Sequence, residues 1–199
     1  RLFSLEIVKP LHTTLTSLAG SDDYAALREV VAEPRVHNIF GDGRAFLRRS
    51  ERQYDIIEAD ALRPTSAYAG NLYSQEYFEL LRSRLKPHGL AVTWAPTERA
   101  KRTFLSVFPY VVHYEPDVSM LIGSNEPITW DAAAMTRRLQ HPFSVAHYGS
   151  ASEELLQSYV EMFATVQPTF YGPEFDRTGL ADLNRDLFPR DEFMTPAAD

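Results

Sequence analysis

Three acidic residues stand where predicted strands of this sequence end, and carboxylates in such positions can carry chemistry. Glu6 lies near the end of an apolar run, Asp42 follows a second run, and Asp60 closes the stretch Tyr54-Asp55-Ile56-Ile57-Glu58-Ala59-Asp60. In an open α/β sheet, ligands bind at the carboxyl ends of the strands, where an Asp reaches a ligand without being buried. Taken singly, each acid also fits a plain turn, because Asp often caps one.

The acids and their neighbours favour a nucleoside ligand when they are taken together. The two oxygens of one carboxylate can accept both cis hydroxyls of a ribose, and a second carboxylate can accept from the exocyclic amine of adenine. Gly41 and Gly43 flank Asp42 and would let the backbone approach a flat base. We expect Glu6, Asp42 and Asp60 to line one cleft.

Alternating strands and helices must position these acids. The predicted strands span residues 2–8, 35–40, 54–60, 90–94, 110–114 and 118–122, and the predicted helices span 11–32 in two pieces, 44–50, 74–86 and 97–108. This alternation predicts an α/β fold with a doubly wound, Rossmann-like, mostly parallel sheet that contains both 2–8 and 54–60. The last two strands should form a hairpin that adds an antiparallel edge.

Polar residues should begin several of the helices. Asp22 or Asp23 is expected to cap the second piece of 11–32, and Ser74 to cap the helix that follows it. Residues 125–199 are predicted to be a helical C-terminal extension of a domain at 1–124, with amphipathic helices at 130–139 and 153–163. The tail 167–199 has little periodicity.

Composition excludes several classes of protein. The formal net charge of −7 argues against a nucleic-acid partner, and the sequence contains no cysteine. No apolar run approaches the ~20 residues that span a bilayer, and no signal peptide is visible, so we expect a cytoplasmic protein without a membrane segment in this chain. The six histidines are scattered without metal-ligand spacing, which predicts no metal site.

Several stretches resemble one family of transferases. The matching text is Pro34-Arg35-Val36, Gly41-Asp42-Gly43-Arg44-Ala45-Phe46-Leu47, the stretch from Tyr54 to Asp60, Asn71-Leu72-Tyr73-Ser74 and Leu85-Lys86-Pro87. Over about residues 2–124 the chain resembles the spermidine synthase family, the polyamine aminopropyltransferases. It is most similar to bacterial spermidine synthase-like proteins, some of which are fused to membrane segments.

The resemblance implies a fold, a reaction and site residues. The family has the fold of class I S-adenosylmethionine-dependent transferases, and its members move an aminopropyl group from decarboxylated S-adenosylmethionine to an amine. By this resemblance Glu6 would hold the ribose, Asp42 the adenine amine, with Gly41 and Gly43 beside it, and Asp60 would be the catalytic base. A small-molecule amine is the implied partner, no metal is required, and a homodimer is the implied assembly.

The chain departs from the family pattern in four places. The glycine-rich loop and the strand before it, which would be central in the sheet, are absent, as is an N-terminal β-rich domain. We therefore expect residues upstream of Arg1, with a membrane region among the alternatives. Arg63 stands where the family has a second acid, and the segment Tyr114 to Val118 lacks the family's Pro-Thr-Tyr-Pro-like text.

Two residues near Asp60 allow more than one role. Tyr73 either hydrogen-bonds the amine or Asp60, or packs on the sheet at the start of a helix. Arg63 would repel a diamine in a cleft with little screening; alternatively it points to solvent, pairs with Glu58 or marks an anionic acceptor. The alternatives to aminopropyl transfer are a methyltransferase that uses S-adenosylmethionine and a non-catalytic nucleoside-binding module, because the fold alone does not fix the chemistry.

Overall fold

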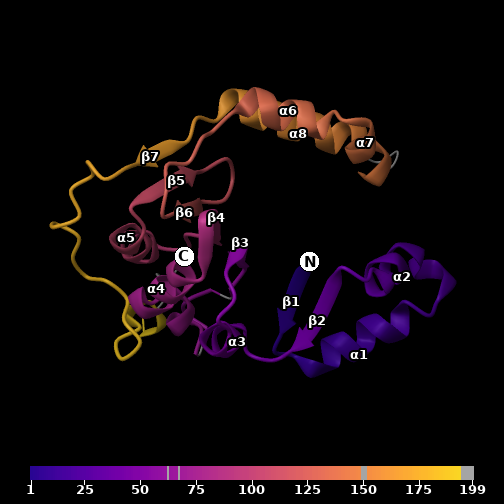
Figure 1. Ribbon diagram of the computed structural model, residues 1–199, viewed down its shortest axis with the longest axis horizontal. Coiled ribbons are helices and arrows are strands. Elements are labelled where there is room, and N and C mark those ends of the chain that lie inside the picture. Colours follow the sequence, from indigo (N-terminus) through magenta and orange to yellow (C-terminus); the bar gives the residue numbers. More distant parts are fainter. Residues whose placement is uncertain (62, 67, 149–151, 194–199) are drawn as a thin grey trace, which may run out of the picture. The chain divides into compact units, whose positions relative to one another are not determined.

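The computed structural model describes residues 1–61, 63–66, 68–148 and 152–193, and the chain divides into two compact units, Arg1–Arg52 and Gln53–Asp199 (Figure 1). Residues 62 and 67 and the last six residues of the predicted tail 167–199 lie outside the described residues.

The first unit is a strand–helix–strand arrangement that ends in a short helix. Strands β1 (Leu2–Glu6) and β2 (Val36–Phe40) pair in parallel, with Glu6 opposite Phe40. Between them run α1 (Lys9–Leu18), the 3₁₀ turn η1 (Asp22–Tyr24) and α2 (Ala25–Ala32), and α3 (Gly43–Arg49) follows β2. Pro10 fits the first turn of α1 because the amide it lacks would have no partner there.

The predicted cap of α2 is wrong. Asp22 and Asp23 belong to η1, and the residue that precedes α2 is Tyr24, which makes no side-chain capping bond. The carboxylate of Asp22 is drawn instead to Arg28, whose Nη2 lies 3.1 Å from Asp22 Oδ1. Asp22 thus pairs with a side chain six residues further along the chain and caps no amide of α2.

The second unit is built on a five-stranded mixed sheet. Its strands are β3 (Tyr54–Ala59), β4 (Leu85–Trp94), β5 (Tyr110–Tyr114), β6 (Met120–Ser124) and β7 (Thr169–Tyr171), in the order β3-β4-β6-β5-β7. Only β3 and β4 pair in parallel, so the prediction of a mostly parallel sheet is wrong for this unit. The predicted hairpin is present as β5 and β6, but β6 lies inside the sheet and β7 supplies the antiparallel edge.

Two helices, α4 (Gln75–Ser83) and α5 (Glu98–Val107), pack together beside this sheet (Figure 1). Ser74 caps α4 as predicted, since its Oγ accepts from the amide of Tyr77 at 3.1 Å. The core between the helices and the sheet is aromatic: the ring centroids of Phe78 and Phe104 are 5.0 Å apart, and those of Phe104 and Phe108 are 4.4 Å apart. Edge-on and offset ring pairs of this kind stabilise a core beyond the area they bury.

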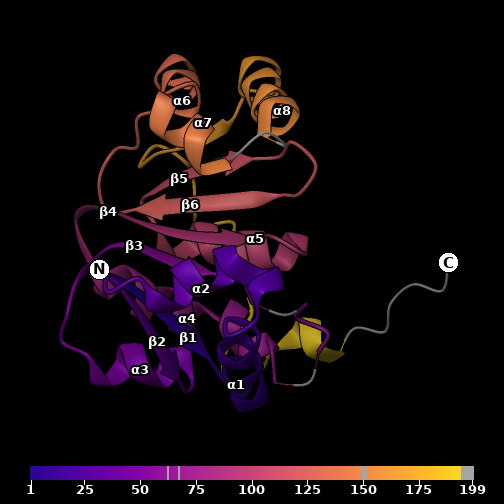
Figure 2. The same ribbon diagram turned by 90° about the vertical axis from the view of Figure 1, so that its right-hand side faces the viewer.

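In its described residues, the C-terminal extension contains three α-helices and then returns to the sheet. Helices α6 (Ala132–Leu139) and α8 (Ser152–Thr165) lie side by side, with α7 (Pro142–Tyr148) next to them (Figure 2). After α8, β7 pairs with β5, and the chain ends its described part in the 3₁₀ turn η3 (Arg190–Phe193). None of the helices that the structure describes is long and apolar enough to cross a bilayer.

Two further details of the predicted sheet differ from the structure. Strands 2–8 and 54–60 do not share a sheet, because β1 pairs with β2 and β3 pairs with β4. Both β1 and β3 are edge strands of their own sheets. The second detail is the start of β4 at Leu85, five residues earlier than predicted, with an irregular register opposite Tyr54.

Candidate functional site

Asp60 is the first residue after β3, and its side chain is exposed. The backbone on either side of it is held by side chains of the same unit. The carbonyl of Ala59 accepts from Thr93 Oγ1 at 3.1 Å, and the carbonyl of Ala61 accepts from Trp94 Nε1 at 2.9 Å and from the hydroxyl of Tyr73 at 3.1 Å. Asp60 is therefore presented to solvent from a backbone that three hydrogen bonds restrain.

Tyr73 is completely buried, and its ring meets Trp94 edge-on, with centroids 6.5 Å apart. Burial raises the pKa of Tyr73 well above its ordinary value, and the charge on Asp60 raises it further. Its hydroxyl donates to the carbonyl of Ala61, the residue after Asp60. The direct contact with an amine that the sequence allows stays a prediction.

Arg63 follows Asp60 by three residues and is exposed, whereas its neighbour Pro64 is buried. Of the alternatives for this arginine, pairing with Glu58 is not found, since the described residues contain no ion pair between the two side chains. The guanidinium is open to solvent, so its charge is available to attract or repel a ligand.

The four residues assigned to the nucleoside lie at the carboxyl ends of β1 and β2. The amide of Gly41 donates to the carbonyl of Glu6 at 2.9 Å, which ties the two strand ends together. Glu6 Oε1 accepts from the amide of Val8 at 2.7 Å. Asp42 Oδ1 accepts from the amide of Ala45 at 2.7 Å, so Asp42 caps α3, which begins at Gly43.

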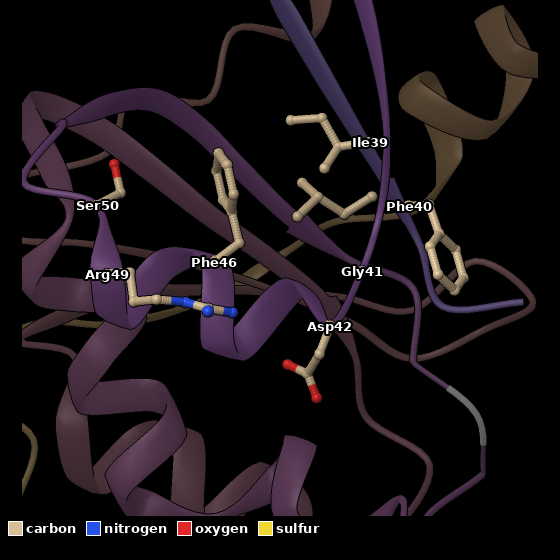
Figure 3. A pocket seen from close by; sticks show the side chains of 8 residues that line it. Ile39, Phe40, Gly41, Asp42, Phe46, Arg49 and Ser50 are labelled. Atoms are coloured by element: carbon tan, nitrogen blue, oxygen red, sulfur yellow. The ribbon is translucent and has the colours of Figure 1, made fainter. Parts of the chain in front are cut away.

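A cavity of about 230 Å³ opens beside this cap (Figure 3). Phe46 of α3 and Ile39 of β2 point toward each other across it, and Arg49 and Asp42 lie at its edge. Pockets for whole drug-sized ligands measure ~300–1,000 Å³. The cavity is thus suited to one ring system of a ligand, with apolar walls for a flat base and a carboxylate at its rim.

The residues present fit the nucleoside part of a donor. Asp42 Oδ2 has no hydrogen-bond partner among the described residues, so one oxygen can accept from an amine while the other caps α3. Glu6 likewise accepts a hydrogen bond only at Oε1 among the described residues, so its Oε2 can accept from a ligand. A methyl group on Gly41 would meet no atom within 4 Å, so the space beside this backbone is open.

The structure brings the predicted site residues together in two groups. Glu6, Gly41, Asp42 and Gly43 belong to the first unit, and Asp60 and Tyr73 belong to the second. That the three acids line one cleft stays a prediction.

Sequence reasoning missed Thr93 and Trp94, which hold the backbone around Asp60. They end β4, the strand that pairs in parallel with β3, with Ala59 opposite Thr93. Two features of the sequence could have indicated them. They stand at the end of a predicted strand, and each has a side-chain hydrogen-bond donor, which needs an acceptor where it is buried. The contact of these two residues with the backbone around Asp60 follows only from the pairing of β3 with β4, which the sequence does not give.

Solved structures of similar shape define the class of fold. A probable spermidine synthase from Corynebacterium glutamicum matches with a TM-score of 0.52 and 18% identity, over 92% of this chain and 63% of that one. A spermidine synthase in complex with the transition state analogue AdoDATO matches with a TM-score of 0.53 and 18% identity, over 80% of this chain and 61% of that one. The chain thus has the Rossmann-like α/β fold of class I S-adenosylmethionine-dependent transferases, as predicted.

Sequence comparison identifies the family in addition to the fold. The family model described as the spermine/spermidine synthase domain matches residues 7–108. Polyamine aminopropyltransferase 2 of Pseudomonas aeruginosa is 31% identical over 102 residues, and the polyamine aminopropyltransferase of Synechococcus sp. is 30% identical over 114 residues. The matches cover 46% and 49% of this chain but only 29% and 36% of those relatives. The chain belongs to the spermine/spermidine synthase family.

Proposed function

We propose that this chain is the catalytic part of an aminopropyltransferase, which moves an aminopropyl group from decarboxylated S-adenosylmethionine to a small-molecule amine. The observation that carries the proposal is the setting of Asp60: an exposed carboxylate directly after β3, on a backbone held by Thr93, Trp94 and Tyr73. Membership of the spermine/spermidine synthase family supports the same chemistry.

Asp60 has the properties that the acceptor amine requires. A primary alkyl amine has a pKa near ~10, like lysine, and arrives protonated, so it cannot attack. The carboxylate of Asp60 attracts this cation, orients it and accepts its proton. The freed nitrogen then forms a bond to the methylene carbon beside the sulfonium of the donor, the carbon–sulfur bond breaks, and methylthioadenosine leaves with the electron pair on sulfur.

The donor would be held by the first unit. In this proposal Glu6 accepts the ribose hydroxyls, Asp42 Oδ2 accepts from the adenine amine, and Gly41 and Gly43 allow the backbone to approach the base. The apolar walls at Phe46 and Ile39 favour a flat ring over a charged group. No metal takes part in any of these steps.

Arg63 bears on the identity of the acceptor. Two cations repel each other, and the repulsion grows as water is excluded from a cleft. An exposed guanidinium three residues from Asp60 disfavours a diamine and favours an acceptor that carries an anionic group beside its amine. Arg63 also favours the two alternatives to aminopropyl transfer, a methyltransferase and a non-catalytic nucleoside-binding module. The reason is that Arg63 stands where aminopropyltransferases carry a second acid.

The products of a single incubation separate these functions. The full chain is supplied with decarboxylated S-adenosylmethionine or S-adenosylmethionine, together with putrescine or with an amine that carries a carboxylate. Release of methylthioadenosine from the decarboxylated donor supports the proposal, and S-adenosylhomocysteine from the other donor would support a methyltransferase. Binding of methylthioadenosine without turnover of either donor would support the binding module.

The assembly and the compartment are proposals of the same kind. A homodimer and a cytoplasmic location are what the family resemblance implies. Light scattering coupled to size-exclusion chromatography tests the first, with a mass of twice 22.6 kDa expected for two copies of this chain. Fractionation of cells that express the protein tests the second.

A further inference from the structure

The described end of the chain, residues 182–193, is anchored in the second unit by a buried polar group. Asp191 is completely buried, and its Oδ2 accepts from Thr97 Oγ1 and from Asn184 Nδ2, both at 2.7 Å. Arg99 donates to Asp191 Oδ1. A buried carboxylate is stable only with such partners, so this anchor has a defined geometry. We call residues 182–193 the clamp segment.

The clamp segment contacts the loop that follows Asp60. Glu192 Oε1 accepts from the amide of Tyr68 at 2.8 Å, and the two residues are 124 positions apart in the sequence. A methyl group on Gly70 would lie 2.6 Å from Pro189 Cβ and 2.9 Å from Glu192 Oε2. The loop backbone thus approaches the clamp segment as closely as a glycine permits.

The same segment also holds the beginning of α4. The amide of Gln75 donates to the carbonyl of Asn184 at 2.9 Å, and Ser74 Oγ donates to Asp186 Oδ1 at 2.6 Å. The amide of Asp186 in turn donates to Glu76 Oε2 at 3.1 Å. The clamp segment therefore restrains the far end of the loop, while Thr93, Trp94 and Tyr73 restrain the end at Asp60.

Tyr68 has the backbone conformation that most needs such a restraint. Its φ is 66°, in the left-handed region that non-glycine residues rarely adopt, and 86% of the residue is exposed. Packing of its own side chain cannot hold this conformation. A strained conformation persists only where surrounding groups enforce it, and the described contact of the Tyr68 amide is the one to Glu192.

We propose that the clamp segment is a positioning element for the acceptor side of the site: Glu192 fixes the backbone at Tyr68, and through it the loop that carries Asp60 and Arg63. This rests on the proposed function, in which Asp60 binds and deprotonates the acceptor amine. Glu192 touches no reacting atom, so its effect should appear in acceptor binding and in the geometry of attack, and the donor should bind unchanged.

Hydrogen exchange at the Tyr68 amide tests the first half of this proposal without any activity. In the full chain, Glu192→Ala should speed this exchange at least tenfold. Glu192→Gln keeps a carbonyl oxygen at the acceptor position and should restore slow exchange. The matched control is Glu174→Ala, because Glu174 also accepts a backbone amide, that of Gly172, in the same C-terminal part of the chain. Unchanged exchange in Glu192→Ala would overturn the proposal.

Kinetics test the second half. Glu192→Ala should raise KM for the acceptor about tenfold or more, with the affinity for methylthioadenosine and the melting temperature close to those of Glu174→Ala, and Glu192→Gln should recover most of the loss. An unchanged KM beside accelerated exchange would overturn the positioning role. A wild-type chain that transfers nothing would instead refute the proposed function, and the exchange result would still decide whether Glu192 holds the loop.

Discussion

At the scale of single residues, the candidate base is defined as much by its neighbours as by its own carboxylate. An acid after a strand is common, but the carbonyls before and after Asp60 each accept from a side chain of β4, and Tyr73 adds a further donor. Restraint of this kind keeps a catalytic group close to its working geometry. The residue scale therefore yields predictions about Tyr73 and about the two-fold role of Asp42.

Tyr73→Phe removes one of the two donors to the Ala61 carbonyl and leaves the indole of Trp94 in place. Because the ring still fills its buried site, the free energy of unfolding should fall by only ~0.5–1.5 kcal/mol, the usual net value of one hydrogen bond. Turnover should fall with donor affinity unchanged. Chemical denaturation and steady-state kinetics measure the two effects, and a variant with wild-type turnover would show that the hydroxyl does not position Asp60.

The ionisation of Tyr73 offers a pH test of its burial. Its pKa in the folded chain lies above the ordinary value of ~10, so the unfolded chain loses this proton first as pH rises. The contribution of the protonated Tyr73 to the free energy of unfolding is therefore fully present below pH 10 and should decrease above it. Tyr73→Phe should reduce this alkaline loss in denaturation curves recorded from pH 9 to 12, and equal slopes for both proteins would contradict the burial.

Asp42 combines a cap with the proposed contact to adenine, and two substitutions separate these roles. Asp42→Ala removes both, and should cost ~0.5–2 kcal/mol of stability for the lost cap and ~1–3 kcal/mol of methylthioadenosine affinity for the lost partner. Asp42→Ser keeps a capping oxygen but is too short for the second contact. Calorimetry should thus find weak binding in a protein of nearly normal stability. Wild-type affinity in Asp42→Ser would refute the adenine role.

At the scale of elements, the position of α5 depends on a glycine in the sheet. Gly123 of β6 lies against α5 and the residue that follows it: a Cβ there would be 2.5 Å from Phe108 Cγ and 2.8 Å from two ring atoms of Phe104. Both rings belong to the aromatic core that joins the helix to the sheet. The spacing between sheet and helix thus has no room for one methyl group.

Gly123→Ala should therefore destabilise the chain by ~1–3 kcal/mol, the usual cost of overpacking a core. The matched control is Gly179→Ala, because a Cβ at Gly179 meets no atom within 4 Å. Thermal unfolding of the two variants beside the wild type measures the difference. Equal melting temperatures for both variants would contradict the packing described.

The clamp segment should respond to acid through Asp182. Its Oδ2 accepts from Arg99 Nε and Nη2 at 3.0 and 2.8 Å, and Arg190 pairs with its Oδ1. These two guanidinium groups hold the pKa of Asp182 at about 2, below the ordinary ~3.9. Because its pKa is lowered in the folded chain, ionised Asp182 contributes to the free energy of unfolding. This contribution is fully present above pH 4 and is lost as pH falls toward 2.

Asp182→Asn isolates this contribution. The difference in melting temperature between wild type and variant should be constant from pH 7 to pH 5 and should shrink steadily as pH falls from 4 to 2. A difference that stays constant down to pH 2 would show that the pairs with Arg99 and Arg190 are not formed in solution.

At the scale of the whole molecule, the sequence predicted elements better than their assembly. Periodicity and capping residues depend on neighbours in sequence, so the helix at α4 with its Ser74 cap was predictable. The place of β6 between β4 and β5 depends on pairings with distant residues and was not. The tail was the least predictable part, because Asp191 and Glu192 look like ordinary loop acids until their distant partners are known, Thr97 at 94 positions and Tyr68 at 124 positions along the chain.

The candidate site likewise contains residues that local patterns predict and residues that depend on distant pairings. Asp60 was predictable because the end of a strand is a local feature with a known use, and the family resemblance points to the same residue. Thr93 and Trp94 act through the parallel pairing of β3 with β4, which local patterns do not give. The double use of Asp42, as cap and candidate ligand, also became visible only when its hydrogen bond to Ala45 was located.

The central claim is that Asp60 is the base of an aminopropyl transfer, and the release of methylthioadenosine by Asp60→Asn tests it most directly. Asn is nearly isosteric, so fold and donor binding should persist, while turnover should fall by ~10²–10⁴, the usual contribution of a positioned base. The matched control is Asp55→Asn on the same strand, whose exposed carboxylate pairs with Lys86 at 2.8 Å and should leave turnover unchanged. Wild-type turnover in Asp60→Asn, under conditions where the wild type releases methylthioadenosine with an amine acceptor, would contradict the claim.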